Sequence, residues 1–199
     1  MKMKKIILIM ICALSMGIVN AQTAKEILDK TASVVNAKKG ATANFTMNGV
    51  YGDATGTITI KGNKFTANTL QAKVWYDGKT QWTYMKSTQE VNVSTPTEAQ
   101  QQAMNPYRFI NLYNMGYDMS KKDVSSGYEV HLKANNAKRT ITEMYITVNK
   151  SFVPITVKMK TAKGWTNINI SNFKSKTLPD SSFRFNAKDY PKAEVIDLR

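Results

Sequence analysis

Trp75-Tyr76-Asp77-Gly78-Lys79-Thr80-Gln81-Trp82-Thr83-Tyr84 is the stretch that decides the fold. Two runs that contain aromatic residues flank an Asp-Gly pair, and in the second run Trp82 and Tyr84 alternate with polar residues. An Asp-Gly pair between two strand-like runs is a strong signal for a β-hairpin. We therefore expect two antiparallel strands here, each with one apolar and one polar face.

The same period of two continues on both sides of this hairpin. Before it, alternation predicts strands around Phe45 and around Ile58; after it, alternation predicts a strand around Val91. Four more strands are predicted at residues 128–132, 140–148, 153–160 and 165–173. So many short strands in one chain predict a mainly β fold with helices (α+β), built on a single strongly curved antiparallel sheet, an open half-barrel.

Two segments depart from this alternation and read as helices. Residues 23–36 place apolar side chains at helical spacing, and Thr23 with Glu26 forms the pattern of an N-terminal capping box. Residues 97–115 are first polar and then rich in aromatic residues, which predicts one or two short helices with an apolar face. Because these apolar faces must be buried, we expect the helices to cover the concave face of the sheet as a lid.

The N-terminus has the pattern of a secretory signal peptide. Lys2, Lys4 and Lys5 precede an apolar run over residues 6–16, and Val19-Asn20-Ala21 suits cleavage after Ala21. The run is too short for a membrane span of about 20 residues. We therefore expect residues 1–21 to be removed on export to the periplasm, and residues 22–199 to form a single domain. The one cysteine, Cys12, lies within the predicted signal.

Few residues in the chain suggest catalysis or metal binding. His131 is the only histidine, and its strand neighbours Val130 and Leu132 place it on the polar side. Without a second histidine or a cysteine beyond the signal, a zinc site or catalytic triad has no residues to build it. We therefore expect no enzyme activity, no metal and no cofactor.

The charge is strongly basic, with 28 Lys and Arg against 14 Asp and Glu, a formal net charge of +14. Such a surface favours anionic partners. Nucleic acid is not expected, because Lys158 and Lys160 alternate with Val157 and Met159, so that the cations and the apolar side chains lie on opposite faces. A platform that stacks bases needs aromatic rings and cations on the same face.

The hairpin, together with the Gln89-Glu90-Val91-Asn92-Val93 run that follows it, resembles the central hairpin of LolA-type outer-membrane lipoprotein carriers. The segments Leu178–Phe185 and Glu194–Asp197 are similar to the closing segment of that family. The resemblance extends over the mature chain. In the family, an Arg-Pro pair precedes the hairpin and its Arg helps to close the lid; the matching stretch Ile60-Lys61-Gly62-Asn63-Lys64-Phe65 has neither residue.

This resemblance implies an apolar cavity under the lid that carries the acyl chains of lipoproteins or lipids. It implies transfer of the cargo from an inner-membrane ABC transporter to an outer-membrane acceptor, and we expect the carrier to be a monomer. The alternative is a periplasmic interaction or lipid-sensing module on the same fold, with a filled core and no transport role.

Apolar residues of the predicted strands and helices are the candidates for the cavity wall. From the sheet we expect these residues: Phe45, Met47, Ile58, Ile60, Trp82, Tyr84 and Val91. From the helices we expect these: Ile27, Val34, Phe109, Ile110 and Leu112.

Overall fold

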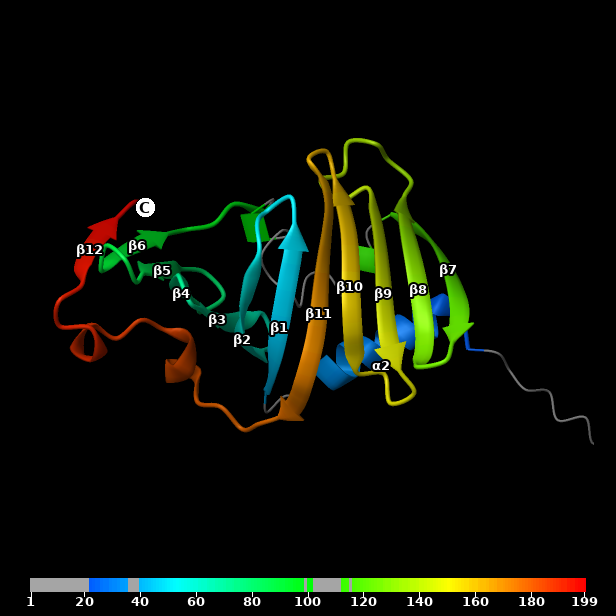
Figure 1. Cartoon of the computed structure of the whole chain (residues 1–199), viewed down its shortest axis with the longest axis horizontal. Coiled ribbons are helices and arrows are strands. Elements are labelled where there is room, and N and C mark those ends of the chain that lie inside the picture. Colours follow the sequence, from blue (N-terminus) through cyan, green and yellow to red (C-terminus); the bar gives the residue numbers. More distant parts are fainter. Residues whose placement is uncertain (1–21, 36–39, 99, 102–111, 115) are drawn as a thin grey trace, which may run out of the picture.

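The computed structural model describes residues 22–35, 40–98, 100–101, 112–114 and 116–199 (Figure 1). The predicted signal peptide therefore lies outside the described residues, as does most of the second predicted helical segment. Among the described residues no helix is both long and apolar enough to cross a membrane.

Twelve strands of the described chain form one sheet, in the order β12-β6-β5-β4-β3-β2-β1-β11-β10-β9-β8-β7. Every neighbouring pair is antiparallel except β12 and β6, which run parallel. The strands are β1 Ala41–Gly49, β2 Ala54–Lys61, β3 Lys64–Thr69, β4 Ala72–Tyr76, β5 Gln81–Met85, β6 Glu90–Ser94, β7 Tyr117–Val124, β8 Gly127–Ala134, β9 Glu143–Asn149, β10 Pro154–Thr161, β11 Gly164–Ser175 and β12 Glu194–Asp197.

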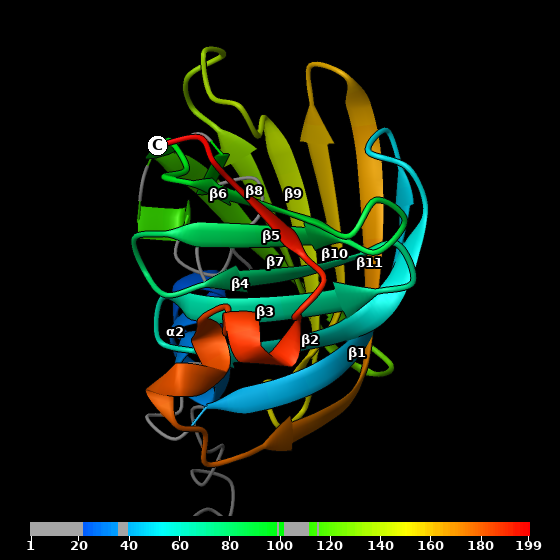
Figure 2. The ribbon, with the colours of Figure 1, turned by 90° about the vertical axis from the view of Figure 1, so that its left-hand side faces the viewer.

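The sheet is open and strongly curved. Its edge strands β12 and β7 do not pair with each other. In the view of Figure 2, β3–β6 run across the picture in front of the upright β8–β11, so the two halves of the sheet face each other around a concave interior. The predicted open, curved and mainly antiparallel sheet is thus confirmed.

The predicted hairpin is present as β4 and β5, which pair Trp75 with Trp82. Asp77 shapes the turn, because its Oδ1 accepts hydrogen bonds from the backbone N–H groups of Lys79 (3.0 Å) and Thr80 (2.9 Å). Gly78 has a φ of +101°, a conformation that residues with a Cβ rarely adopt. The Asp-Gly pair therefore has the role in the turn that its chemistry predicts.

Helix α2 (Ala24–Val35) is the predicted N-terminal helix, and its capping box is formed. The Thr23 N–H donates to Glu26 Oε2 at 2.8 Å, and the Glu26 N–H donates to Thr23 Oγ1 at 3.2 Å. One face of α2 packs on the concave side of β7–β9, where Ile27 and Leu28 are fully buried. This half of the concave side is solid core, built with Val130, Leu132, Met144, Ile146 and Val148 from the sheet.

The helical lid is only partly present in the described residues. Besides α2, the second predicted segment shows the short 3-10 helix η1 (Leu112–Asn114), whose Tyr113 hydroxyl donates a hydrogen bond to Asp29 of α2. The remaining short helices, η2 (Asp180–Phe183) and η3 (Ala187–Asp189), belong to the C-terminal segment and are not part of the concave interior. Residues 98 and 100–101, at the start of the second predicted segment, are also helical, and most of the rest of that segment lies outside the described residues.

Candidate functional site

An apolar cavity of about 570 Å³ lies against the concave face of the sheet, beside the core that α2 fills. Its wall is almost wholly hydrophobic. The lining residues are Val35, Ala41, Thr42, Ala43, Phe45, Met47, Tyr51, Ala54, Ile58, Ile60, Phe65, Ala67, Thr69, Val74, Gln100, Ile146, Pro154, Val157, Met159, Ile168, Ile170 and Phe173. None of these side chains carries a charge, so the cavity suits an uncharged apolar ligand.

The strand register brings the wall together from distant parts of the sequence. Ala43 pairs with Ile58, Ile58 with Ala67, and Ala67 with Val74, so one row of inward side chains crosses four strands. Two members of this row are alanines, and Ala41 and Ala54 also lie on the wall. Small side chains opposite large ones leave a hollow that the sheet does not fill itself.

Four predicted site residues line this cavity: Phe45, Met47, Ile58 and Ile60. Of the helical candidates, Ile27 is fully buried in the neighbouring core, and the last residue of α2, Val35, lines the cavity in place of the predicted Val34. Phe109 and Ile110 lie outside the described residues. Leu112 is part of η1, and its side chain is also outside the described set.

The expectation that Trp82, Tyr84 and Val91 line the cavity is wrong. The register aligns Trp82 with Trp75, and Tyr84 with Lys73 and Val91, which places these residues on the face opposite Ile58 and Val74. Alternation had identified one apolar face of β5 and β6 correctly, but this face is the convex one. It is apolar because another part of the chain covers it.

The C-terminal residues 178–190, here called the strap, provide that cover (Figure 2). The Tyr190 ring lies 5.4 Å from Trp75 and 4.7 Å from Tyr84, and Phe185 lies 5.6 Å from Trp75, as distances between ring centroids. Lys73 Nζ lies 4.7 Å from the centre of the Trp75 ring. These aromatic contacts leave Trp75 only 4% exposed. They support β4, whose opposite face lines the cavity, from the convex side.

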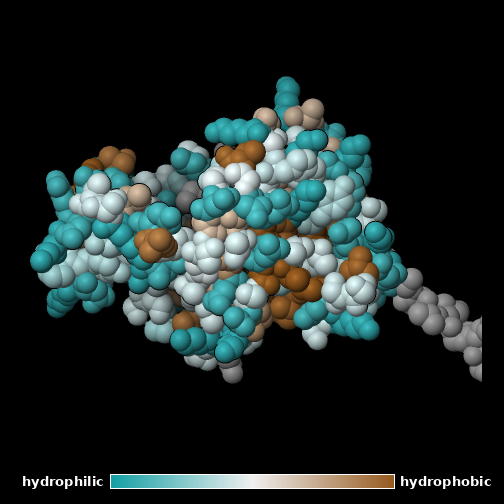
Figure 3. Space-filling view, viewed as in Figure 1, coloured by the Kyte–Doolittle hydropathy of each residue, from teal (hydrophilic) through white to brown (hydrophobic). Residues whose placement is uncertain are grey.

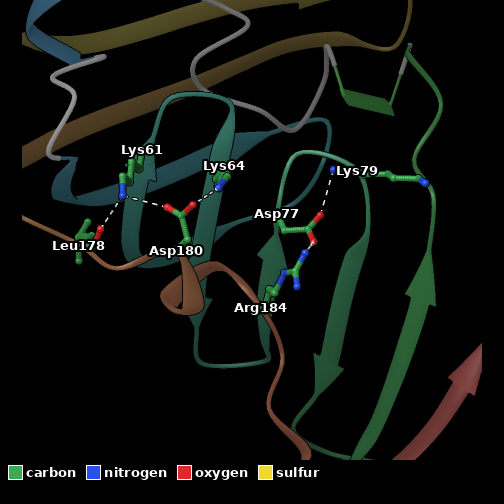
Figure 4. Close-up of polar contacts among 7 residues, drawn as sticks. All are labelled: Lys61, Lys64, Asp77, Lys79, Leu178, Asp180 and Arg184. Atoms are coloured by element: carbon green, nitrogen blue, oxygen red, sulfur yellow. Dashed lines mark hydrogen bonds and ion pairs between the residues drawn. The ribbon is translucent and has the colours of Figure 1, made fainter.

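Ion pairs fix the strap to the sheet (Figure 4). Asp180 accepts hydrogen bonds from Lys61 at 2.9 Å and Lys64 at 2.6 Å, and Lys61 also donates to the Leu178 carbonyl at 2.8 Å. These bonds from Lys61 and Lys64 hold the pKa of Asp180 at about 2, below its usual 3.8. The two lysines belong to the stretch Ile60–Phe65, which precedes the hairpin, and they bind the strap.

A second ion pair joins Arg184 of the strap to Asp77 of the β4–β5 turn at 3.0 Å. Burial alone would raise the pKa of Asp77, but the backbone N–H groups of Thr80 and Lys79 and the Arg184 guanidinium more than offset it. The net effect is a lowered pKa, so Asp77 stays charged in the folded protein.

The single histidine does not form a catalytic arrangement within the described residues. His131 lies on the convex face, where Nε2 is 2.9 Å from Glu143 Oε1 and the ring stacks on Tyr145 with centroids 4.3 Å apart. In the described part of the chain, no hydrogen bond joins it to a serine or threonine hydroxyl. No group of three or more potential metal ligands occurs among the described residues either.

A sequence profile described as "Outer membrane lipoprotein carrier protein LolA" matches residues 14–163, well over half of the chain. The chain belongs to the LolA family. This LolA family member also shares its fold with an uncharacterized conserved protein from Thermus thermophilus, with a TM-score of 0.59 at 15% sequence identity. The match covers 88% of this chain and 99% of the Thermus protein.

Two other solved structures are more distant from this LolA family member. A LolA superfamily protein from Nitrosomonas europaea matches 83% of this chain and 99% of its own, at 13% identity and a TM-score of 0.46. The Pseudomonas aeruginosa MucA/MucB complex matches 83% of this chain and 62% of its own, at 12% identity and a TM-score of 0.49. A comparison with curated proteins finds no match.

Proposed function

We propose that this protein is an exported periplasmic carrier that holds the acyl chains of lipoproteins or lipids in the 570 Å³ cavity. The observation that carries the proposal is the wall itself, which is apolar, uncharged and not filled by its own side chains. Its volume falls within the range of about 300–1,000 Å³ typical of small-molecule sites. Membership of the LolA family supports the same reading.

The energetics suit reversible carriage. Burying each CH₂ group is worth about 0.8 kcal/mol, so an acyl chain of about 16 carbons gains on the order of 12 kcal/mol on leaving water. A cargo of this kind needs shelter to cross an aqueous compartment. Because Phe45, Met47 and Ile58 offer only apolar contact, the carrier needs no chemistry to release it, only an acceptor of equal or better affinity.

The polar part of the cargo stays outside the cavity in this proposal. Thr42, Thr69, Tyr51 and Gln100 are the only polar residues on the described wall, and none of them could neutralise a charge. A lipoprotein or phospholipid would therefore enter by its acyl chains and leave its protein or headgroup in water. Family membership further supports an inner-membrane ABC transporter as the donor and an outer-membrane acceptor as the recipient.

Displacement of a fluorescent fatty acid tests this function. The purified protein, delipidated, should bind the probe with a blue shift and increased emission, and a diacylated or triacylated lipopeptide should displace it in a saturable manner. The unacylated form of the same peptide is the control and should not compete. A protein that binds neither probe nor lipopeptide would instead be an interaction module without a carrier role.

A further inference from the structure

Four turns lie side by side at one end of the strands, at residues 50–53, 70–71, 86–89 and 162–163. We call them the turn row. Hydrogen bonds fix their adjacency. The Val50 N–H donates to the Trp165 carbonyl at 3.2 Å, and the Lys86 N–H donates to the Gln71 carbonyl at 2.9 Å. Between them, the pairing of Gly56 with Thr69 places the β1–β2 turn beside the β3–β4 turn.

The turn row carries an unusual share of the exposed hydrophobic residues. Five large hydrophobic side chains are exposed among the described residues, and three belong to the row: Leu70 at 83%, Tyr51 at 46% and Val50 at 39%. A single exposed hydrophobic residue needs no explanation. Val50 and Tyr51 lie on one turn and Leu70 on the neighbouring turn, and Leu70, at the tip of a hairpin, contributes almost no packing to the fold.

Two lysines lie beside these apolar side chains, and the row also contains one acid, Asp53. Lys86 Nζ donates to the Thr69 carbonyl at 2.6 Å, directly beside Leu70, and Lys163 Nζ lies 6.0 Å from the centre of the Tyr51 ring. The ring of Trp165, which follows the fourth turn, lies 4.5 Å from Lys158 Nζ. Aromatic residues and lysines beside exposed aliphatic side chains are the composition of surfaces that sit at the interface of a bilayer.

The row is continuous with the proposed cargo site. Tyr51 in the β1–β2 turn and Thr69 at the end of β3 also line the cavity. Ala54 does so at the start of β2. An object that contacts the turn row is therefore next to the cavity wall. The face seen in Figure 3 is mainly hydrophilic, with one hydrophobic patch near its centre, and a hollow on the convex side is lined largely by Asn, Thr, Tyr and Lys side chains.

We propose that the turn row docks the carrier on an anionic phospholipid bilayer, with Leu70 entering the acyl region and Lys86 and Lys163 contacting the headgroup phosphates. Anionic lipid is the occupant that the charge of the chain favours, at a formal +11 without the three lysines of the predicted signal peptide. This inference rests on the proposed function, because docking would let acyl chains pass between the cavity and the bilayer without a protein acceptor.

Flotation with lipid vesicles tests the inference. The purified protein is mixed with vesicles of phosphatidylethanolamine and phosphatidylglycerol in equal parts, or with neutral phosphatidylcholine vesicles, and the floated fraction is measured. The wild type should bind the anionic vesicles, and added salt should weaken binding. Leu70→Asp should lower the affinity by about tenfold or more, since it loses the burial of a leucine side chain.

Leu198→Asp is the matched control, because Leu198 is a similarly exposed leucine (63%) remote from the row, and it should bind like the wild type. Binding of the fluorescent fatty acid by Leu70→Asp should remain unchanged, which separates failure of docking from failure of the cavity. A wild type that does not float with anionic vesicles overturns the inference, as does a Leu70→Asp variant that floats equally well. In the first case a protein acceptor becomes the partner of this edge.

Discussion

Trp75 of β4 and Tyr190 of the strap meet edge to face, with ring centroids 5.4 Å apart and ring planes at 86°, although 115 positions separate them in the chain. This contact explains why both faces of β4 are buried. Tyr76 and Val74 face the concave side, and Trp75 faces the strap. The strap thus gives the β3–β6 half of the sheet a second apolar layer, while the concave side remains free for the cavity.

Removing the Tyr190 ring should destabilise the protein substantially. Tyr190 contacts Trp75, Tyr84 and Phe185, and deletion of a large aromatic side chain from such a cluster costs about 2–4 kcal/mol. Urea unfolding of Tyr190→Ala, monitored by tryptophan fluorescence, measures this cost. Tyr51→Ala is the control and should lose less than about 1 kcal/mol, because Tyr51 is half exposed. A loss for Tyr190→Ala no larger than that for Tyr51→Ala would contradict a packing role for the Tyr190 ring.

The Lys61–Asp180–Lys64 ion pairs should make stability depend on pH only in strong acid. The folded pKa of Asp180 is about 2, below the usual 3.8, so its contribution is fully present above about pH 4 and is lost as the pH falls toward 2. The melting temperature of Asp180→Asn should therefore lie below that of the wild type at pH 7, and the two should converge near pH 2. A difference that stays constant over this range would contradict the assignment.

The capping box of α2 should contribute measurably to stability. Thr23→Ala removes the hydroxyl that accepts the Glu26 N–H bond, and loss of such a cap costs about 1 kcal/mol. Ser33→Ala, on the exposed face of the same helix, is the control and should change the free energy of unfolding by less than about 0.5 kcal/mol. Urea titration compares the two. A cap variant as stable as the wild type would indicate that α2 is held by packing alone.

A charge on the cavity wall should abolish ligand binding, whereas the same charge on the adjacent convex position should not. Ile58 lines the cavity, and Thr59, the next residue, points to the other face. We expect Ile58→Asp to weaken binding of a fluorescent fatty acid by more than about tenfold, because a buried unpaired carboxylate is costly. Thr59→Asp should bind like the wild type. Circular dichroism of both variants checks that the fold is retained, and equal binding would refute the placement of the ligand.

The sequence predicted the local elements well, because their signals are local. Asp77-Gly78 marked the hairpin, and Thr23 with Glu26 marked the start of α2. Alternation also identified the inward residues of β1 and β2, where the convex face carries threonine and asparagine and the apolar face is unambiguous. Phe45, Met47, Ile58 and Ile60 were therefore placed correctly on the cavity wall.

The faces of β5 and β6 could not be assigned in the same way. A period of two shows which side chains share a face, but it does not show which face is concave. Here the strap covers the convex face at Tyr84, whose ring contacts Tyr190, more than 100 residues further along the chain. The run Val74-Trp75-Tyr76 contained the signal, since three consecutive apolar residues in a strand indicate burial on both faces. The aromatic residues Phe183, Phe185 and Tyr190 supply the covering layer.

Mass spectrometry of an organic extract tests the central claim most directly. The wild type and the Ala67→Phe variant are purified without detergent and extracted, and the amount of lipid per protein is measured. Ala67→Phe adds an aromatic ring where a small side chain lines the cavity. The cavity predicts acyl-chain lipid in a fixed ratio to the wild type and little or none in Ala67→Phe. A wild type that is consistently free of lipid, and that also leaves a hydrophobic fluorophore unchanged, would contradict the carrier function.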